Sequence, residues 1–244
     1  MRALALDEGL DVAHVVLGMV HWMLDWDLTA AEQELLRAIE LCPSNSDVYT
    51  FYAIFLSHVD RLSEAAAQVQ YALRLDPGSL FPNHAAAWIY LGQRHLAKAE
   101  DQARRTLALF PDAIHANFVL GWAAWCRSRI AEAVTAFEKA FSLSREAFSL
   151  AFLGYVYGSI GRRDEAIGLF RELDGLFTKG QAPPVAFAII HAGFGETNTA
   201  FDWLETAYRL RDDKIFWLRM IPAFDLLRPD PRFNALLCRI PSLG

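Results

Sequence analysis

The sequence predicts an all-α protein, a right-handed α-solenoid of about six helix-turn-helix repeats with a C-terminal capping helix. Three observations lead to this prediction. Pro43, Pro77 and Pro111 follow one another at intervals of 34 residues. Small residues recur twice within the same interval. Elsewhere apolar residues recur three and four positions apart, as in "AVTAFEKAF" (133–141), which is helical spacing.

The small residues occupy two fixed positions in each repeat. Counting from residues 46, 80, 114, 147 and 181, the eighth position holds Ala53, Ala87, Gly121, Gly154 and Ala188. The twentieth position holds Ala65, Ala99, Ala133, Ala166 and Ala200. Only Gly or Ala lets two helix backbones approach closely where they cross. These positions therefore mark the crossing of two helices in each hairpin.

The register divides the chain into a repeat array, 11–211, and a C-terminal cap, 212–244. The predicted repeats are 11–45, 46–79, 80–113, 114–146, 147–180 and 181–211. Gly161 and Gly195 are suited to ending the first helix of their hairpins. Asp230 is a predicted N-cap, with Pro231 in the first turn of a short helix that ends before Pro241.

The first repeat contains one extra residue, because Gly18 fits the eighth position whereas Ala31 falls one place late. We expect a longer turn, "LDWDL", to absorb it, and a capping box of Thr29 and Glu32 to open the second helix. Residues 1–10 resemble the end of an upstream repeat helix. The chain is therefore expected to begin within a repeat, as part of a longer protein or of a shortened gene; the alternative is an atypical N-terminal cap.

Composition favours a folded protein without nucleic-acid affinity. Hydrophobic residues make up 54% of the chain and the net charge is −6, which argues against a surface that neutralises phosphates. The three cysteines are sparse and show no metal-ligand spacing, so we expect a reducing, cytoplasmic environment and no metal or other cofactor. No signal peptide or membrane span is predicted, so no membrane contact is expected.

The repeats resemble tetratricopeptide repeats (TPRs), whose period is also 34 residues. Two segments, "LDWDLTAAEQELLRAIELCPSN" and "FDLLRPDPRFNALL", are similar to the C-terminal repeat region of bacterial multidomain signalling proteins. In that group the repeats follow a winged-helix DNA-binding domain, a serine/threonine kinase domain or a nucleotide cyclase domain. The present sequence contains none of these effector domains.

The resemblance implies a binding groove lined by positions 2, 5, 9 and 12 of the first helix in each repeat. At these positions the chain carries an aromatic set, His84, Trp88, His115, Phe118, Trp122, Trp125, Phe148 and Tyr155. Aromatic rings anchor peptides with large contact area, so this set is the predicted peptide-binding groove. The alternative is that Trp88 and Trp122 pack against the next repeat as core residues, and that His84 and His115 are simply polar groove residues.

Neither a carboxylate clamp nor catalysis is indicated by the sequence. A clamp for acidic C-terminal tails requires Lys, Arg and Asn in the groove, and Asn83 and Asn117 fall outside the groove positions. His21 and Asp25 lie four residues apart, but Asp25 and Asp27 are better explained as helix-capping residues. The chain lacks a phosphate-binding glycine loop and the hydrolase and metalloprotease motifs, so it is not expected to be an enzyme.

These observations predict a non-catalytic scaffold that binds a protein or peptide in its groove, within a bacterial signalling or regulatory system. One alternative is a small-ligand sensory module of a transcriptional regulator or kinase. A helical-repeat protein that reads RNA is a second alternative, disfavoured by the acidic charge and by a groove without basic residues. The apolar end of the first repeat is a candidate for end-to-end self-association.

Overall fold

A computed structural model describes residues 11–243; the predicted remnant helix at 1–10 lies outside the described residues. Within this range the chain is helical throughout and forms no β-strand. It divides into two compact units. The first ends at Phe110 and also includes the residues from Pro241 onward, and the second spans 111–240. No helix in the described part of the chain is both long and apolar enough to cross a membrane.

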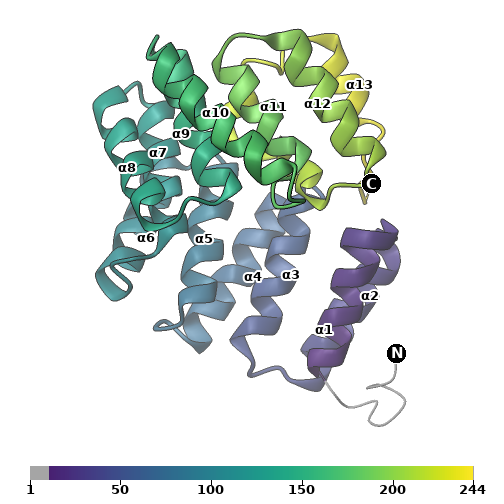
Figure 1. The fold of residues 1–244 in the computed structure, drawn as a ribbon. Coiled ribbons are helices and arrows are strands. Elements are labelled where there is room, and N and C mark those ends of the chain that lie inside the picture. Colours follow the sequence, from purple (N-terminus) through teal and green to yellow (C-terminus); the bar gives the residue numbers. More distant parts are fainter. Residues whose placement is uncertain (1–10, 244) are drawn as a thin grey trace. The chain divides into compact units, whose positions relative to one another are not determined.

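The first unit is a stack of three α-hairpins (Figure 1). Within each hairpin two helices pack antiparallel, and the first helix of one hairpin packs on the first helix of the next. The helices are α1 (Asp11–Val20) with the π-helical turn η1 (His21–Asp25), α2 (Leu28–Leu41), α3 (Ser46–His58), α4 (Leu62–Leu75), α5 (Leu80–Gly92) and α6 (Leu96–Leu109).

The second unit continues the hairpin pattern and adds an irregular C-terminal part. Its three hairpins are followed by two 3-10 segments and a short helix. The elements are α7 (Ile114–Cys126), α8 (Ile130–Leu143), α9 (Ala147–Ser159), α10 (Arg163–Phe177), α11 (Pro184–Gly193), α12 (Thr197–Arg209), η2 (Asp213–Arg219), η3 (Pro222–Phe224) and α13 (Pro231–Leu237). This all-helical architecture of adjacent hairpins is the fold class that the sequence predicts.

The predicted helix crossings lie at the centre of the hairpins. All eight alanines of the crossing set have 0% exposure. A β-carbon on Gly121 would lie 2.7 Å from the ring of Phe137 in the same hairpin, whereas one on Gly154 would lie 3.8 Å from Leu169 of its own hairpin and 2.3 Å from Ile190 of α11, in the next hairpin. Because ordinary contacts between carbon atoms exceed about 3.4 Å, a larger residue would force the helices apart.

The turns of the five hairpins after the first use the same backbone motif. The fifteenth residue of the repeat has a positive φ, and the next residue donates its N–H to the carbonyl oxygen five places earlier, as Arg129 does to Ala124 at 2.9 Å. This is the Schellman arrangement that ends helices. The fifteenth residues are Asp60, Arg94, Ser128, Gly161 and Gly195, so the glycines visible in the sequence mark only two of the five turns.

The first hairpin accommodates its extra residue inside a helix. η1 is a π-helical turn, which contains one residue more than an α-helical turn, and Trp26 then takes φ 61°. The expectation of a longer loop is therefore wrong. The capping box is also wrong: Asp27 is the N-cap and its side chain accepts a hydrogen bond from the Ala30 N–H at 3.0 Å, whereas Thr29 lies inside α2.

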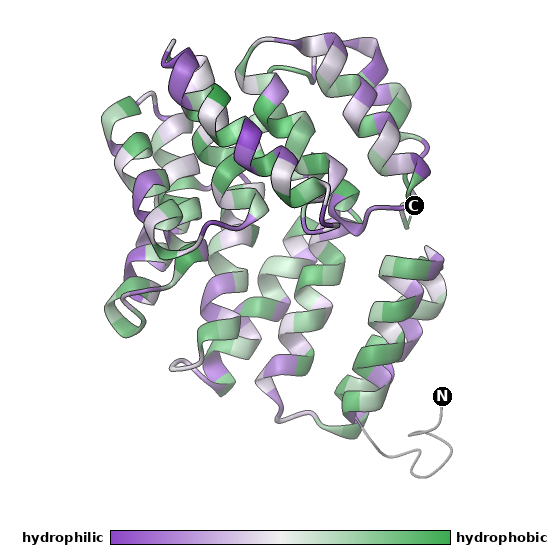
Figure 2. Cartoon of the chain, in the orientation of Figure 1, coloured by the Kyte–Doolittle hydropathy of each residue, from purple (hydrophilic) through white to green (hydrophobic). Residues whose placement is uncertain are grey.

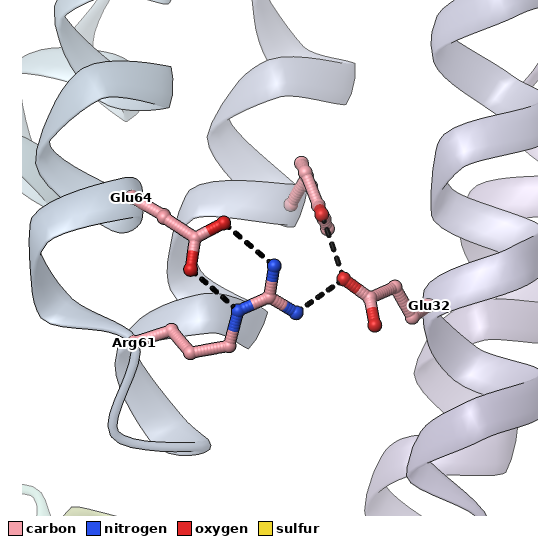
Figure 3. A network of polar contacts seen from close by, with 4 residues as sticks. Glu32, Arg61 and Glu64 are labelled. Carbon is pink, nitrogen blue, oxygen red and sulfur yellow. Dashed lines mark hydrogen bonds and ion pairs between the residues drawn. The ribbon is translucent and has the colours of Figure 1, made fainter. Parts of the chain in front are cut away.

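A polar network joins neighbouring hairpins in the first unit (Figure 3). Glu32 of α2 accepts hydrogen bonds from the Tyr52 hydroxyl at 2.8 Å and from Arg61 at 2.5 Å, and Arg61 also forms a two-pronged ion pair with Glu64. A similar arrangement recurs in the second unit, where Glu138 accepts from the Tyr157 hydroxyl at 2.6 Å and lies 3.5 Å from Arg162. These networks join the first hairpin to the second and the fourth to the fifth.

The C-terminal helix closes the second unit as expected. Asp230 caps α13 by accepting from the Arg232 N–H at 2.9 Å, and the helix ends at Leu237, which confirms the predicted cap residue. α13 packs on α12, and residues 34 positions apart are hydrogen-bonded: Arg232 of α13 with Asn198 at 2.9 Å, and Arg239, which follows α13, with Glu205 at 2.7 Å. The repeat spacing thus persists in the contacts after it has disappeared from the sequence.

Candidate functional site

The predicted groove residues of the first unit lie on α5. His84 and Trp88 are both partly exposed. They lie four residues apart, so they share one face of the helix. Phe81, on the same helix, packs against Phe51 of α3 with ring centres 4.8 Å apart. The first unit therefore presents aromatic surface on the first helices of two successive hairpins.

The predicted residues of the second unit fall into two groups. His115 is exposed and Trp125 and Phe148 are partly exposed, so these three can contact a ligand. The other three side chains are buried, with 1%, 0% and 1% exposure for Phe118, Trp122 and Tyr155. The prediction that these three line a groove is corrected: they belong to the core.

The buried group is an aromatic cluster centred on Trp122. Its ring lies 5.1 Å from Phe137, 5.2 Å from Phe152 and 5.3 Å from Tyr155, in edge-on or tilted orientations. Phe137 comes from the same hairpin and the other two come from the next one. Edge-to-face packing of this kind is favourable for aromatic rings. Trp122 is therefore a core residue that joins two hairpins, the alternative that the sequence left open.

α11 is also buried on the side that carries its groove positions, which the repeat register does not predict. Val185 and Ile189 occupy groove positions 5 and 9, yet both have 0% exposure. η3 packs against α11 and η2 packs against α12, and the chain from Ile215 to Leu227 buries most of its apolar side chains. In Figure 2 most of α11 has the colour of hydrophobic residues. The C-terminal part thus caps the first-helix face of the last hairpin as well as its end.

The same C-terminal part reaches α9. Trp217 of η2 lies against Phe148 with ring centres 4.8 Å apart, and the ammonium group of Lys214 lies 5.5 Å from the Trp217 ring. Both aromatic rings are partly exposed. Trp217 is therefore a surface aromatic residue that the repeat positions could not identify. The apolar run "IFWLRMIPAF" is the sequence signal, because a cap without such a run would leave α11 open.

Asp212 fixes the start of this segment. Its side chain accepts hydrogen bonds from the Lys214 N–H at 3.0 Å and from the Val185 N–H, at the beginning of α11, at 3.4 Å. Burial raises the pKa of the Asp212 carboxyl above its usual range, and the two backbone hydrogen bonds oppose this only in part. One half-buried side chain thus joins the start of η2 to the start of α11.

The electrostatics of the partly exposed residues favour uncharged contacts. Although His115 is partly open to solvent, desolvation by the protein around it lowers its pKa, so its imidazole is neutral at neutral pH and can both donate and accept a hydrogen bond. Partial desolvation also raises the pKa of Glu146, the residue that precedes α9. The positions predicted to line the groove contain no Lys or Arg in either unit.

The remaining polar candidates have structural partners. Asn83 is buried and donates to the carbonyl oxygens of Pro77 and Ser79, and Asn117 donates to that of Ala113. His21 and Asp25 are 2.9 Å apart on η1. Among residues 11–243 no group of three or more His, Cys, Asp or Glu side chains is placed to hold a metal ion.

Comparisons with known proteins bear on both the repeat and the fold. Residues 84–147 match the tetratricopeptide repeat family. No curated protein matches the sequence. Among solved structures, PilW, a type IV pilus biogenesis factor, has 21% identity and a TM-score of 0.61, over 72% of this chain and 82% of PilW.

Two further structures share the fold. A thermophilic TPR protein of Thermus thermophilus has 17% identity and a TM-score of 0.62, over 71% of this chain and 92% of its own. The APC/C hetero-tetramer Cut9–Hcn1 contains a chain with 16% identity and a TM-score of 0.66, over 97% of this chain and 44% of that one. Together with the 34-residue spacing, these similarities identify the fold as that of tetratricopeptide repeat proteins.

Proposed function

We propose that this protein is a non-catalytic scaffold that holds a protein or peptide partner on the first-helix faces of its hairpins. The main observation in support is that Trp88, Trp125 and Phe148 are partly exposed on these helices. Other aromatic residues at groove positions, Phe118, Trp122 and Tyr155, are buried. Rigid aromatic side chains lose little entropy on binding and supply large contact area. His84 and His115 add polar groups beside them.

The second unit offers an internal precedent for such binding. η3 lies on α11 without regular α-helical structure, and Trp217 of η2 packs on Phe148 of α9. The faces of these first helices are therefore chemically suited to irregular polypeptide that carries apolar and aromatic side chains. A partner segment of the same character, bound beside this one, would use the exposed parts of Phe148 and Trp125.

The biological setting is a separate element of the proposal. The resemblance of two segments to the repeat regions of bacterial signalling proteins supports a place in a signalling or regulatory system. PilW and the Cut9–Hcn1 assembly have the same fold in other settings, a pilus biogenesis factor and an APC/C hetero-tetramer. The partner should therefore be sought without assuming a pathway.

The test compares surface and core substitutions. Trp88→Ala, Trp125→Ala and Phe148→Ala together should abolish capture of a specific polypeptide from host lysate while leaving the melting temperature within a few degrees. The captured polypeptide should then bind the purified protein stoichiometrically in calorimetry. Phe141→Ala, a partly exposed ring on α8, is the matched control and should bind normally.

Two results would contradict the proposal. Unchanged binding by the triple variant would place the contact surface elsewhere. A stoichiometric small molecule in the purified protein, with no polypeptide captured, would favour the sensory module instead. Trp122→Ala calibrates the folding readout, because its fully buried ring should cost about 3–5 kcal/mol when removed.

A further inference from the structure

The aromatic side chains of the first unit form a row across two helices. Phe51 of α3 lies against Phe81 of α5 with ring centres 4.8 Å apart. On α5, His84 and Trp88 follow Phe81 at intervals of three and four residues, so these three side chains share one face of the helix. All four rings are partly exposed. We call Phe51, Phe81, His84 and Trp88 the aromatic row.

A carboxylate lies beside this row on α3. Asp47 precedes Phe51 by four residues, so the two side chains are neighbours on one face of the helix. Asp47 is exposed, and among residues 11–243 its carboxylate has neither an ion pair nor a hydrogen bond. Its place in the first turn of α3 also stabilises that helix through the helix dipole. A measurement of stability detects this second effect separately from binding.

This chain completes similar pairs of ring and carboxylate with its own arginines. Four guanidinium groups lie 3.8 to 4.4 Å from the centre of an aromatic ring and also form an ion pair with a carboxylate. They belong to Arg145, Arg162, Arg232 and Arg239. A cation in this position gains ion-pair and cation–π energy together. At Asp47 and Phe51 the carboxylate and the ring are present, and a partner can supply the cation.

The charge of the first unit favours such a partner. Lys and Arg are absent from all the first helices, α1, α3, α5, α7, α9 and α11. Residues 11–110 contain 12 acidic and 7 basic residues, a net charge of −5, whereas residues 111–240 contain 15 of each. A basic segment is therefore attracted to the first unit, and an acidic segment would bring like charges together at Asp47.

We propose that the first unit binds a polypeptide segment in which an Arg or Lys side chain pairs with Asp47 and lies over Phe51. Apolar side chains next to this basic residue pack on Phe81 and Trp88. The proposal rests on the proposed function, because it names the chemistry of the segment that the scaffold holds.

The test selects ligands for the full chain from a displayed library of random short peptides. Peptides selected by the wild type should be enriched in Arg or Lys beside aromatic or aliphatic residues and depleted of Asp and Glu. A synthetic peptide from this selection should bind Asp47→Asn about twofold to fivefold more weakly in fluorescence anisotropy, the loss expected for one exposed ion pair. Replacing the peptide's basic residue by Gln should remove this difference, which a double-mutant cycle measures.

Asp101→Asn is the matched control. Asp101 is exposed on α6, a second helix of the same unit, so the substitution removes the same charge away from the aromatic row. It should leave peptide binding unchanged. Asp47→Asn should keep its melting temperature within a few degrees of the wild type, so that weaker binding does not reflect unfolding.

The outcomes separate this proposal from the proposed function. Selected peptides that lack a basic preference but lose binding in Trp88→Ala would overturn this proposal and leave the scaffold function intact. Equal losses in Asp47→Asn and Asp101→Asn would also overturn it, because only overall charge would then act. Failure to select any peptide would count against it too, since a short segment should suffice. Peptides that bind independently of Trp88, Trp125 and Phe148 would contradict the proposed function itself.

Discussion

Gly193 of α11 lies directly against the backbone of Tyr155 in α9: a β-carbon on Gly193 would be 2.4 Å from the Tyr155 α-carbon and 2.5 Å from its carbonyl oxygen. The neighbours are backbone atoms, which cannot rotate away as a side chain can. This contact sets the distance between the first helices of two successive hairpins. It lies outside the eighth and twentieth positions that mark crossings within a hairpin.

Gly193→Ala should therefore destabilise the protein by about 2–3 kcal/mol, the usual cost of overpacking a tight interior contact. The measurement is equilibrium unfolding in urea. Gly168→Ala on α10 is the control, because a β-carbon there meets nothing within 4 Å. It should stabilise the helix by about 0.5–1 kcal/mol. Equal effects of the two substitutions would contradict the close approach.

Ser128 occupies a turn position that favours glycine. Its φ is 57°, in the left-handed region, where a β-carbon is strained. Ser128→Gly should raise the free energy of unfolding by about 0.5–1 kcal/mol, after allowance for the greater freedom of glycine in the unfolded chain. The reverse change, Gly161→Ala at φ 84°, should lower it by a similar amount. A loss of stability in Ser128→Gly would show that the serine side chain stabilises this turn.

Asp212 should give an unusual pH dependence. Its folded-state pKa is raised by burial, so the folded protein binds a proton more readily than the unfolded chain does. Its contribution to stability therefore falls as pH rises from the unfolded pKa to the folded one. Asp212→Asn removes the charge and keeps only one of the two oxygens that accept these backbone N–H groups, so one hydrogen bond is lost at every pH and the slope of stability against pH is the test. The stability of this variant relative to wild type should therefore increase as pH rises above the ordinary aspartate pKa of about 4.

Asp230 supplies the opposite case for the same measurement. Hydrogen bonds from the Arg232 side chain and backbone lower the pKa of its carboxyl. A depressed pKa gives stability that is present above the unfolded pKa and lost as pH falls. Relative to wild type, Asp230→Asn should therefore lose stability as pH rises toward the ordinary aspartate pKa of about 4, and the difference should stay constant above it. If stability relative to wild type changed with pH in the same direction for both variants, one of the two pKa directions would be wrong.

The contact between Tyr52 and Glu32 should couple two hairpins energetically. Tyr52→Phe removes the hydroxyl that Glu32 accepts at 2.8 Å and should cost about 1 kcal/mol. Because Arg61 shares the same oxygen, Tyr52→Phe and Glu32→Gln should be non-additive. A double-mutant cycle in urea unfolding measures this directly. Additive effects would mean that the two side chains do not interact in solution.

Helix positions and crossings were predictable because they depend on residue size and local spacing. Ala65 and Gly154 lie where the 34-residue register predicts close approach. The turn positions were only partly predictable. Asp60, Arg94 and Ser128 adopt the same left-handed conformation as Gly161 and Gly195. Their residue types do not reveal it, because the packed helices on both sides impose the turn.

The groove residues show that helical spacing alone does not predict whether a side chain is exposed. Position 5, 9 or 12 of a repeat specifies the direction of a side chain relative to its own helix. Whether that side is open depends on what packs over it. Trp122 and Trp125 both occupy groove positions, yet the first is fully buried against the next hairpin and the second is not.

The sequence by itself determined the helical class, the repeat spacing, the crossing residues and the Asp230 cap, since each follows from the size or hydrogen-bonding capacity of residues close together along the chain. Only the tertiary structure decided that Phe118, Trp122 and Tyr155 are core, that η3 packs on α11, and that Trp217 contacts Phe148. Whether an apolar helix face is exposed depends on which distant segment packs over it. That choice is made by the free energy of packing the whole unit and leaves no periodic signal in the sequence.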